Sequence, residues 1–167
     1  NRKPKTPIAK TETIIKINKS RRDKIEQQLI QLCFVKDSKI RNLLYQNVQQ
    51  EWFKNTNYKH IFDKVFIHLH GEEIPNANII MDQLDELDRA SLSELIFEID
   101  EKNPSIKLAI DCIIGLETFD INSKLNQKRD ELKLNPTPEK LTKILNEIAN
   151  YQEQRTQIKT KYVEQDL

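Results

Sequence analysis

The last thirty residues carry a narrow apolar stripe that constrains the fold more than any other feature of the chain. Thr137, Pro138 and Glu139 are typical of a helix start, and the helical pattern continues to Gln165. The apolar positions alternate spacings of three and four: Leu141, Ile144, Leu145, Ile148, Tyr151, Ile158 and Tyr162. This spacing places one apolar face along a single long helix.

A similar stripe lies just upstream, and a short turn separates the two. Its apolar residues are Ile114, Ile121, Leu125 and Leu132, and the turn is Leu134-Asn135-Pro136. Two amphipathic helices joined by a tight turn predict an antiparallel helical hairpin. A two-helix hairpin has no interior that encloses an active site, but it presents a long surface. We therefore expect it to bind another protein.

The rest of the chain is also predicted to be helical, because helix breakers are rare. Only two glycines and six prolines occur in 167 residues, and the stretches between them are rich in Leu, Ile, Lys, Glu and Gln. The sequence predicts an all-α fold. A compact bundle of five to six short helices is expected over residues 19–117, followed by a C-terminal antiparallel helical hairpin over residues 118–167. Residues 1–18, which contain Pro4 and Pro7, are expected to form a basic linker arm.

Capping residues locate the helices of the bundle. Helix starts are expected near Ser20, Asp37, Asn57, Pro75, Asp88 and Ser105. Gly71 is expected at the left-handed position that ends the helix begun near Asn57. Residues 115–123 allow two interpretations: either the helix continues through Gly115 with a bend, or Asp120 caps a new helix.

Charge is unevenly distributed, although the net charge is only +1. Residues 1–24 carry nine Lys and Arg against two acids, whereas residues 72–120 carry thirteen acids against three bases. We expect weak or no nucleic-acid binding by the folded part. A solvated tail is the expected role of the basic arm, and nucleic-acid contact is its alternative. No apolar run approaches the ~20 residues that cross a membrane, so we expect no membrane contact and a cytoplasmic protein.

Histidines and acids do not form a metal-binding pattern in the sequence. His68 and His70 lie two apart on a predicted helix, so their side chains point about 200° apart. His60 and Asp63 can share a face, but two ligands do not make a metal site. We therefore expect no metal.

The sequence also lacks the motifs of nucleophilic and phosphate chemistry. Cys33 and Cys112 lie in apolar stretches without a neighbouring basic or histidine motif, which is typical of reduced core thiols. The two glycines are too far apart for a phosphate loop. We expect no catalytic residue, no cofactor and no small-molecule substrate in this chain.

The bundle pattern resembles a known domain family. The elements that carry it are an early Ile/Leu helix, Phe53, Tyr58-x-His60-Ile61-Phe62, Ile67-x-Leu69-x-Gly71-x-x-Ile74-Pro75, Leu84-Asp85-Glu86-Leu87 and Leu92-x-x-Leu95-Ile96-x-Glu98-Ile99. Over about residues 20–115 this order is similar to the C-terminal domain of bacterial replicative DNA primase, and to the related N-terminal domain of the replicative DNA helicase. Because the primase domain adds a C-terminal helical hairpin, the hairpin here favours primase.

The resemblance implies a helicase-interaction module without polymerising activity. It would dock primase on the replicative hexameric helicase and modulate that helicase during RNA primer synthesis at the replication fork. The zinc-binding and RNA-polymerising domains of the parent would lie upstream. The expected partner-binding residues lie on the hairpin: Leu134, Leu141, Ile144, Tyr151, Arg155, Ile158, Lys161 and Tyr162. The last helix is expected to extend beyond the preceding helix at Ile158, Tyr162 and Val163. Two interpretations stay open for Ile158 and Tyr162: they are buried within the hairpin, or they are held out for a partner.

Two other functions remain open at this point. One is the N-terminal oligomerisation or collar domain of the replicative helicase itself. The other is an unrelated helical regulator that binds nucleic acid through residues 1–24, which include the basic arm.

Overall fold

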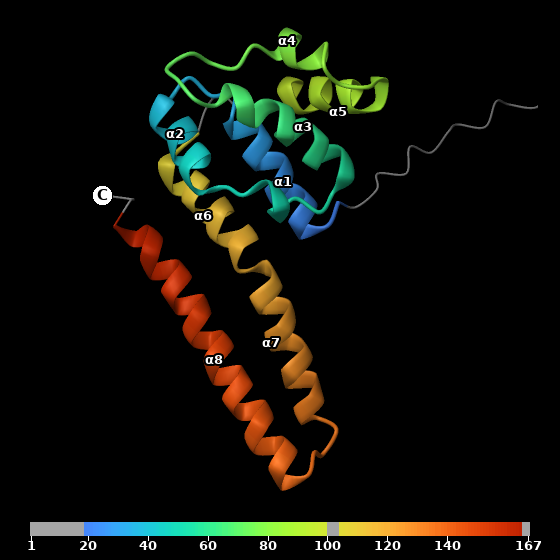
Figure 1. Cartoon of the computed structure of the whole chain (residues 1–167), viewed down its shortest axis with the longest axis vertical. Coiled ribbons are helices and arrows are strands. Elements are labelled where there is room, and N and C mark those ends of the chain that lie inside the picture. Colours follow the sequence, from blue (N-terminus) through green and yellow to red (C-terminus); the bar gives the residue numbers. More distant parts are fainter. Residues whose placement is uncertain (1–18, 100–103, 165–167) are drawn as a thin grey trace, which may run out of the picture.

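The computed structural model describes residues 19–99 and 104–164, and it confirms the all-α fold (Figure 1). The bundle elements are α1 (Arg21–Leu32), α2 (Ser38–Asn47), the 3-10 helix η1 (Gln50–Trp52), α3 (Thr56–His68), α4 (Ala77–Met81), α5 (Glu86–Phe97) and α6 (Ile106–Glu117). The hairpin consists of α7 (Phe119–Leu132) and α8 (Pro138–Val163), and it projects from one side of the bundle. The expected linker arm at residues 1–18 lies outside the described residues, as does Gln165.

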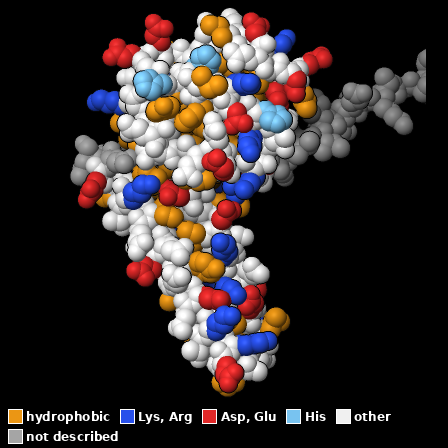
Figure 2. Space-filling view, viewed as in Figure 1, with side chains coloured by type: hydrophobic (Ala, Val, Ile, Leu, Met, Phe, Trp, Pro, Cys, Tyr) orange, Lys and Arg blue, Asp and Glu red, His pale blue; other side chains and the backbone are white. Residues whose placement is uncertain are grey.

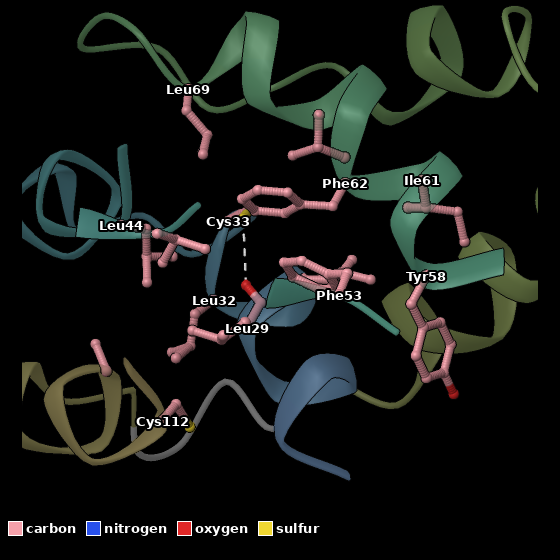
Figure 3. Packing of buried hydrophobic residues seen from close by; sticks show 14 of the residues in the cluster. Leu29, Leu32, Cys33, Leu44, Phe53, Tyr58, Ile61, Phe62, Leu69 and Cys112 are labelled. Atoms are coloured by element: carbon pink, nitrogen blue, oxygen red, sulfur yellow. Dashed lines mark hydrogen bonds between the residues drawn. The ribbon is translucent and has the colours of Figure 1, made fainter. Parts of the chain in front are cut away.

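The core of the bundle forms around α1, which packs against α2, α3, α5 and α6. Its buried side chains are mainly aliphatic, with an aromatic pair at the centre (Figure 3). The rings of Phe53 and Phe62 stack with their centroids 4.4 Å apart, and both side chains are buried. Trp52, beside Phe53, is half-buried against the same core. This aromatic pair therefore joins η1 to α3 by packing.

Three of the expected helix starts are confirmed by cap geometry. Ser20 and Asp23 form a reciprocal capping box at the start of α1, with hydrogen bonds of 3.1 and 3.2 Å. Asp37 caps α2, and Ser105 caps α6. Asn76, next to Pro75, caps α4, which ends after only five residues.

Two expected caps are wrong by two or three residues. Asn55, not Asn57, caps α3 by accepting from the Tyr58 amide at 3.2 Å. Asp85, not Asp88, caps α5. The physical reason is that Asp88 is buried and faces His60, with 3.0 Å between Oδ2 and Nδ1, so it cannot serve as the cap.

The end of α3 also differs from expectation. The helix stops at His68 with Leu69 as its C-cap, so Gly71 lies beyond the position that ends the helix. Gly71 has a φ of +133°, a conformation that L side chains rarely adopt, and it turns the chain toward α4.

The joint between bundle and hairpin is a break at Thr118, so the helix does not continue through residues 115–123 and Asp120 does not cap α7. Thr118 ends α6 and precedes α7, and its hydroxyl donates to the Ile114 carbonyl at 2.6 Å. Gly115 is inside α6 and is not the bend. A Cβ at Gly115 would lie 3.0 Å from Cδ1 of Ile25, so the missing side chain allows α1 and α6 to approach closely.

Candidate functional site

The hairpin is the candidate site, and its two helices pack against each other. Ile144 of α8 and Leu125, in the middle of α7, are buried. Tyr151 and Ile158 follow at helical spacing and are half-buried. Four of the expected partner-binding residues therefore differ in burial. Ile144, Tyr151 and Ile158 line the seam between the two helices, whereas Leu141 keeps 40% of its surface exposed.

Polar contacts across the seam hold α7 and α8 together. Lys128 of α7 lies 2.8 Å from Glu147 of α8 and 3.2 Å from Glu131 on its own helix. The hydrogen bond from Lys128 lowers the pKa of Glu147, and the hydrogen bond to Glu147 raises the pKa of Lys128. Arg155, an expected partner residue, donates to the Asn122 side chain at 3.3 Å. Part of its bonding capacity is therefore used within the hairpin.

The end of α8 packs against the bundle, so Tyr162 is not held out for a partner. Tyr162 is fully buried and belongs to the core cluster of the bundle. Its hydroxyl donates to Glu117 Oε2 at 2.6 Å, and burial together with the Glu117 carboxylate raises the pKa of Tyr162. The reason is that α8 is long enough to reach past α7 and return to α6, so the bundle covers what α7 does not.

The neighbours of Tyr162 are only partly covered. Ile158 packs against the edge of the core, whereas Val163 is 63% exposed. The Lys161 amine lies 3.8 Å from Glu117 Oε1 and 4.8 Å from the centre of the Tyr162 ring. Lys161, also expected at a partner interface, is more than half exposed and remains accessible.

Apart from Val163, the large exposed apolar residues of the described hairpin lie around its tip. Leu134 in the turn is 79% exposed, and Leu141 and Leu145 on the first turns of α8 are 40% and 49% exposed. The backbone reverses at Asn135, which has a φ of 52°. On the face seen in Figure 2, acidic and basic side chains are mixed along the hairpin, and hydrophobic side chains lie between them, some of them near its end.

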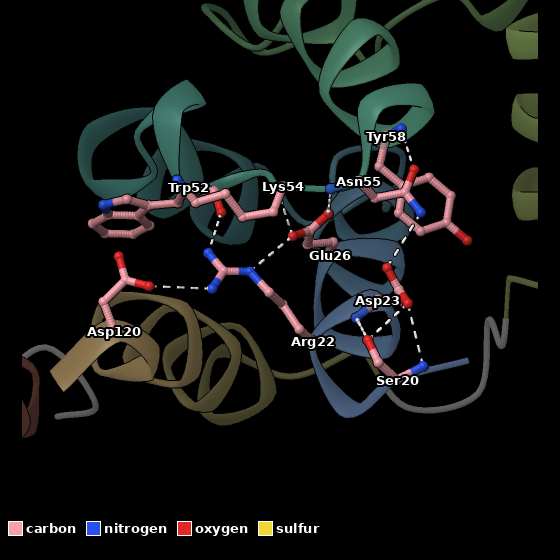
Figure 4. Close-up of polar contacts among 9 residues, drawn as sticks. All are labelled: Ser20, Arg22, Asp23, Glu26, Trp52, Lys54, Asn55, Tyr58 and Asp120. Atoms are coloured by element: carbon pink, nitrogen blue, oxygen red, sulfur yellow. Dashed lines mark hydrogen bonds and ion pairs between the residues drawn. The ribbon is translucent and has the colours of Figure 1, made fainter. Parts of the chain in front are cut away.

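A polar cluster, missed in the sequence, attaches the base of the hairpin to the bundle (Figure 4). Arg22 of α1 lies 3.1 Å from Glu26 and 3.5 Å from Asp120, and it donates to the Trp52 carbonyl at 2.6 Å. Its guanidinium carbon also lies 4.4 Å from the centre of the Phe119 ring. Arg22 therefore ties the first residues of α7 to α1 and η1.

Glu26, the centre of this cluster, is completely buried. Besides Arg22, it accepts from the backbone amides of Lys54 at 2.9 Å and Asn55 at 3.1 Å. These amides precede α3, so Glu26 orients the start of that helix. The sequence signal was an acid four residues after an arginine, at a position on the apolar face of α1.

The positions of the histidines and cysteines bear on metal binding and on thiol reactivity. Within residues 19–99 and 104–164, no three His, Cys, Asp or Glu side chains are grouped so that they could hold a metal ion. Both cysteines are buried, and burial raises the pKa of each thiol, to about 12 for Cys112. In the same described part, no helix is long and apolar enough to cross a membrane.

Comparison with known proteins adds no relative. No protein-family model matches the chain, and neither a curated protein nor a solved structure shows significant similarity to it. The function is therefore inferred from the residues and geometry of this chain alone.

Proposed function

We propose that this chain is the helicase-interaction module of a bacterial primase, which docks primase on the replicative hexameric helicase. The observation that carries the proposal is a two-helix hairpin that projects from a compact bundle with exposed leucines at its tip. Leu134, Leu141 and Leu145 lie within the first turns around the hairpin loop, and burying such side chains drives protein association. The residue pattern of the bundle, which resembles the primase and helicase domains, supports the choice of partner.

In this proposal the module contributes binding and no chemistry. Tethering the polymerising part of primase to the helicase raises its effective concentration beside freshly unwound template. The polar attachment at Arg22 and the buried Tyr162 support this role, because they hold both helices of the hairpin against the bundle. A hairpin held at a defined angle loses less conformational freedom on binding.

The docking surface is assigned to the tip and not to the end of α8. Tyr162 is used inside the protein, whereas Leu134, Leu141 and Leu145 are accessible. Arg155 and Lys161 lie farther along α8 and can add charged contacts at the rim of the interface.

Calorimetric titration with the replicative helicase of the same organism tests the proposal. Replacing Leu134, Leu141 or Leu145 by Ser should weaken binding by about 1–2 kcal/mol each if that leucine is an anchor, or about 5- to 30-fold in Kd. Ile67→Ser is the matched control, because Ile67 is 68% exposed on α3, away from the hairpin. Undiminished affinity in all three leucine variants, or no binding by the unaltered chain, would refute the proposal.

The alternative of a helicase collar domain predicts a different result. Such a domain assembles with copies of itself, so light scattering would find oligomers of this chain without any added helicase. A monomer that binds helicase is the outcome expected for the primase module.

A further inference from the structure

The outward face of α5 is apolar although no described element covers it. Phe97 is 91% exposed and Leu87 is 64% exposed. Ala90 lies between them, and spacings of three and seven residues put all three on one side of the helix. The opposite side of α5 carries the buried Leu92 and Leu95, which pack into the core.

Acidic side chains surround this apolar face. Glu86, Glu94 and Glu98 are exposed on it, and within the described residues none of them forms an ion pair. The base on α5, Arg89, is directed elsewhere, since it donates to the carbonyls of Met81 at 3.1 Å and Leu84 at 3.3 Å. An occupant of this face must therefore be both basic and apolar.

The chain itself supplies a segment with that chemistry. Residues 1–18 contain five Lys and Arg against one Glu, interspersed with four isoleucines: Ile8, Ile14, Ile15 and Ile17. The residue that follows this segment is connected to the end of α5 through Gln27 of α1. The Lys19 amine donates to Gln27 at 2.9 Å, and the Gln27 amide donates to Glu98 at 3.0 Å.

We propose that the basic arm, residues 1–18, docks on the outward face of α5 of its own chain. Its isoleucines cover Phe97 and Leu87, and its Lys and Arg side chains pair with Glu94, Glu98 and Glu86. Leu87 and Phe97 are ten positions apart on the helix, a length of about 15 Å. An arm of eighteen residues has a root-mean-square length of about 24 Å when flexible and reaches about 60 Å when extended. It therefore spans the face without strain.

Tethering makes a weak contact sufficient. A short flexible tether gives an effective concentration in the millimolar range. A contact with an intrinsic free energy of about −4 kcal/mol, which corresponds to a Kd of about 1 mM, is then occupied about half of the time. Lysines of the arm that pair with α5 cannot bind nucleic acid at the same time, so nucleic acid and α5 would compete for them.

A spin label on the arm of the full chain tests this contact. In Thr6→Cys the new thiol is the reactive one, because Cys33 and Cys112 are buried. The label should broaden the amide resonances of Ala90, Glu94 and Phe97 in isotope-labelled protein, and it should leave Leu134 at the hairpin tip sharp. Raising the salt to about 1 M shortens the Debye length to about 3 Å and should restore the α5 resonances.

Charge reversals on matched surfaces complete the test. Glu94→Lys with Glu98→Lys should abolish the broadening, whereas Glu139→Lys with Glu153→Lys, at exposed positions of α8, should not. Absence of broadening at α5, or broadening that survives the α5 reversals, overturns the proposal. Broadening seen only between a spin-labelled copy and a separate isotope-labelled copy also overturns it, since the occupant would then be a second chain.

Discussion

Replacing Tyr162 tests whether the end of α8 is a structural part of the bundle. The side chain is fully buried in the core cluster, and its hydroxyl donates to Glu117 at 2.6 Å. Tyr162→Ala removes a buried ring and leaves a cavity, which should lower the free energy of unfolding by about 3–5 kcal/mol. Tyr162→Phe removes only the hydrogen bond. A bond to a charged acceptor contributes about 1.5–3 kcal/mol, and because Glu117 is partly exposed the lower end of that range is expected.

Urea unfolding followed by far-ultraviolet circular dichroism measures both losses. Tyr151→Ala is the control, because Tyr151 is a half-buried tyrosine on the same helix, in the hairpin seam. Tyr151→Ala should lower the free energy of unfolding by less than Tyr162→Ala does. A loss below about 1 kcal/mol for Tyr162→Ala would be typical of an ordinary surface position and would refute the packing described above.

The pH dependence of the Tyr162→Phe effect gives an independent check. The folded pKa of Tyr162 lies above the ordinary value of 10.0, so the folded state holds its proton more tightly than the unfolded state. The stability from this tyrosine is therefore fully present below pH 10.0 and is lost as pH rises above that value. The stability difference between the unaltered chain and Tyr162→Phe should shrink by up to about 1.4 kcal/mol for each pH unit above that point. A difference that is constant with pH contradicts the buried hydroxyl.

Three further substitutions test the Glu26 cluster, the buried Arg41 of α2 and the turn of the hairpin. Glu26→Gln leaves Arg22 without its buried carboxylate and should lower the free energy of unfolding in urea by about 3 kcal/mol. Full recovery of that free energy in a Glu26→Gln, Arg22→Met double variant would show that the unpaired charge is the cause. Arg41→Lys should cost about 2 kcal/mol in the same assay, because one ammonium cannot replace a guanidinium that donates to the carbonyls of Val35, Lys36 and Glu72. Asn135 has a positive φ, and holding a valine there should destabilise the folded state by about 1–2 kcal/mol. Asn135→Val should therefore lower the melting temperature, whereas Asn135→Gly should not.

Local features of the fold were predictable from the sequence, because they depend on neighbouring residues. The Ser20 capping box and the Pro138 helix start each involve contacts within one helical turn. The caps of α3 and α5 were misplaced because two candidate residues lie within three positions of each other, and periodicity does not choose between them. The choice depends on Asp88 being buried beside His60, which is 28 residues away.

The candidate site was harder to predict for the same physical reason. Apolar spacing identifies the face of α8 that is buried, but it does not say which element covers that face. Tyr162 and Glu117 are separated by 45 residues, and Arg22 and Asp120 by 98. The sequence pattern therefore grouped Tyr162 with Leu141 on one stripe, although the bundle covers the first and solvent reaches the second.

The attachment of both hairpin helices to the bundle changes how its binding role is best tested. Arg22 holds the start of α7 through Phe119 and Asp120, and Tyr162 holds the end of α8 through Glu117. All three contacted residues lie within residues 117–120, so both attachments act on the joint around Thr118. Truncating α8 after Tyr151 removes one attachment and opens the bundle core, so a loss of helicase binding in that variant would not separate docking from unfolding. The exposed leucines of the tip make that separation, since they are far along α7 and α8 from the joint and contribute little to the core.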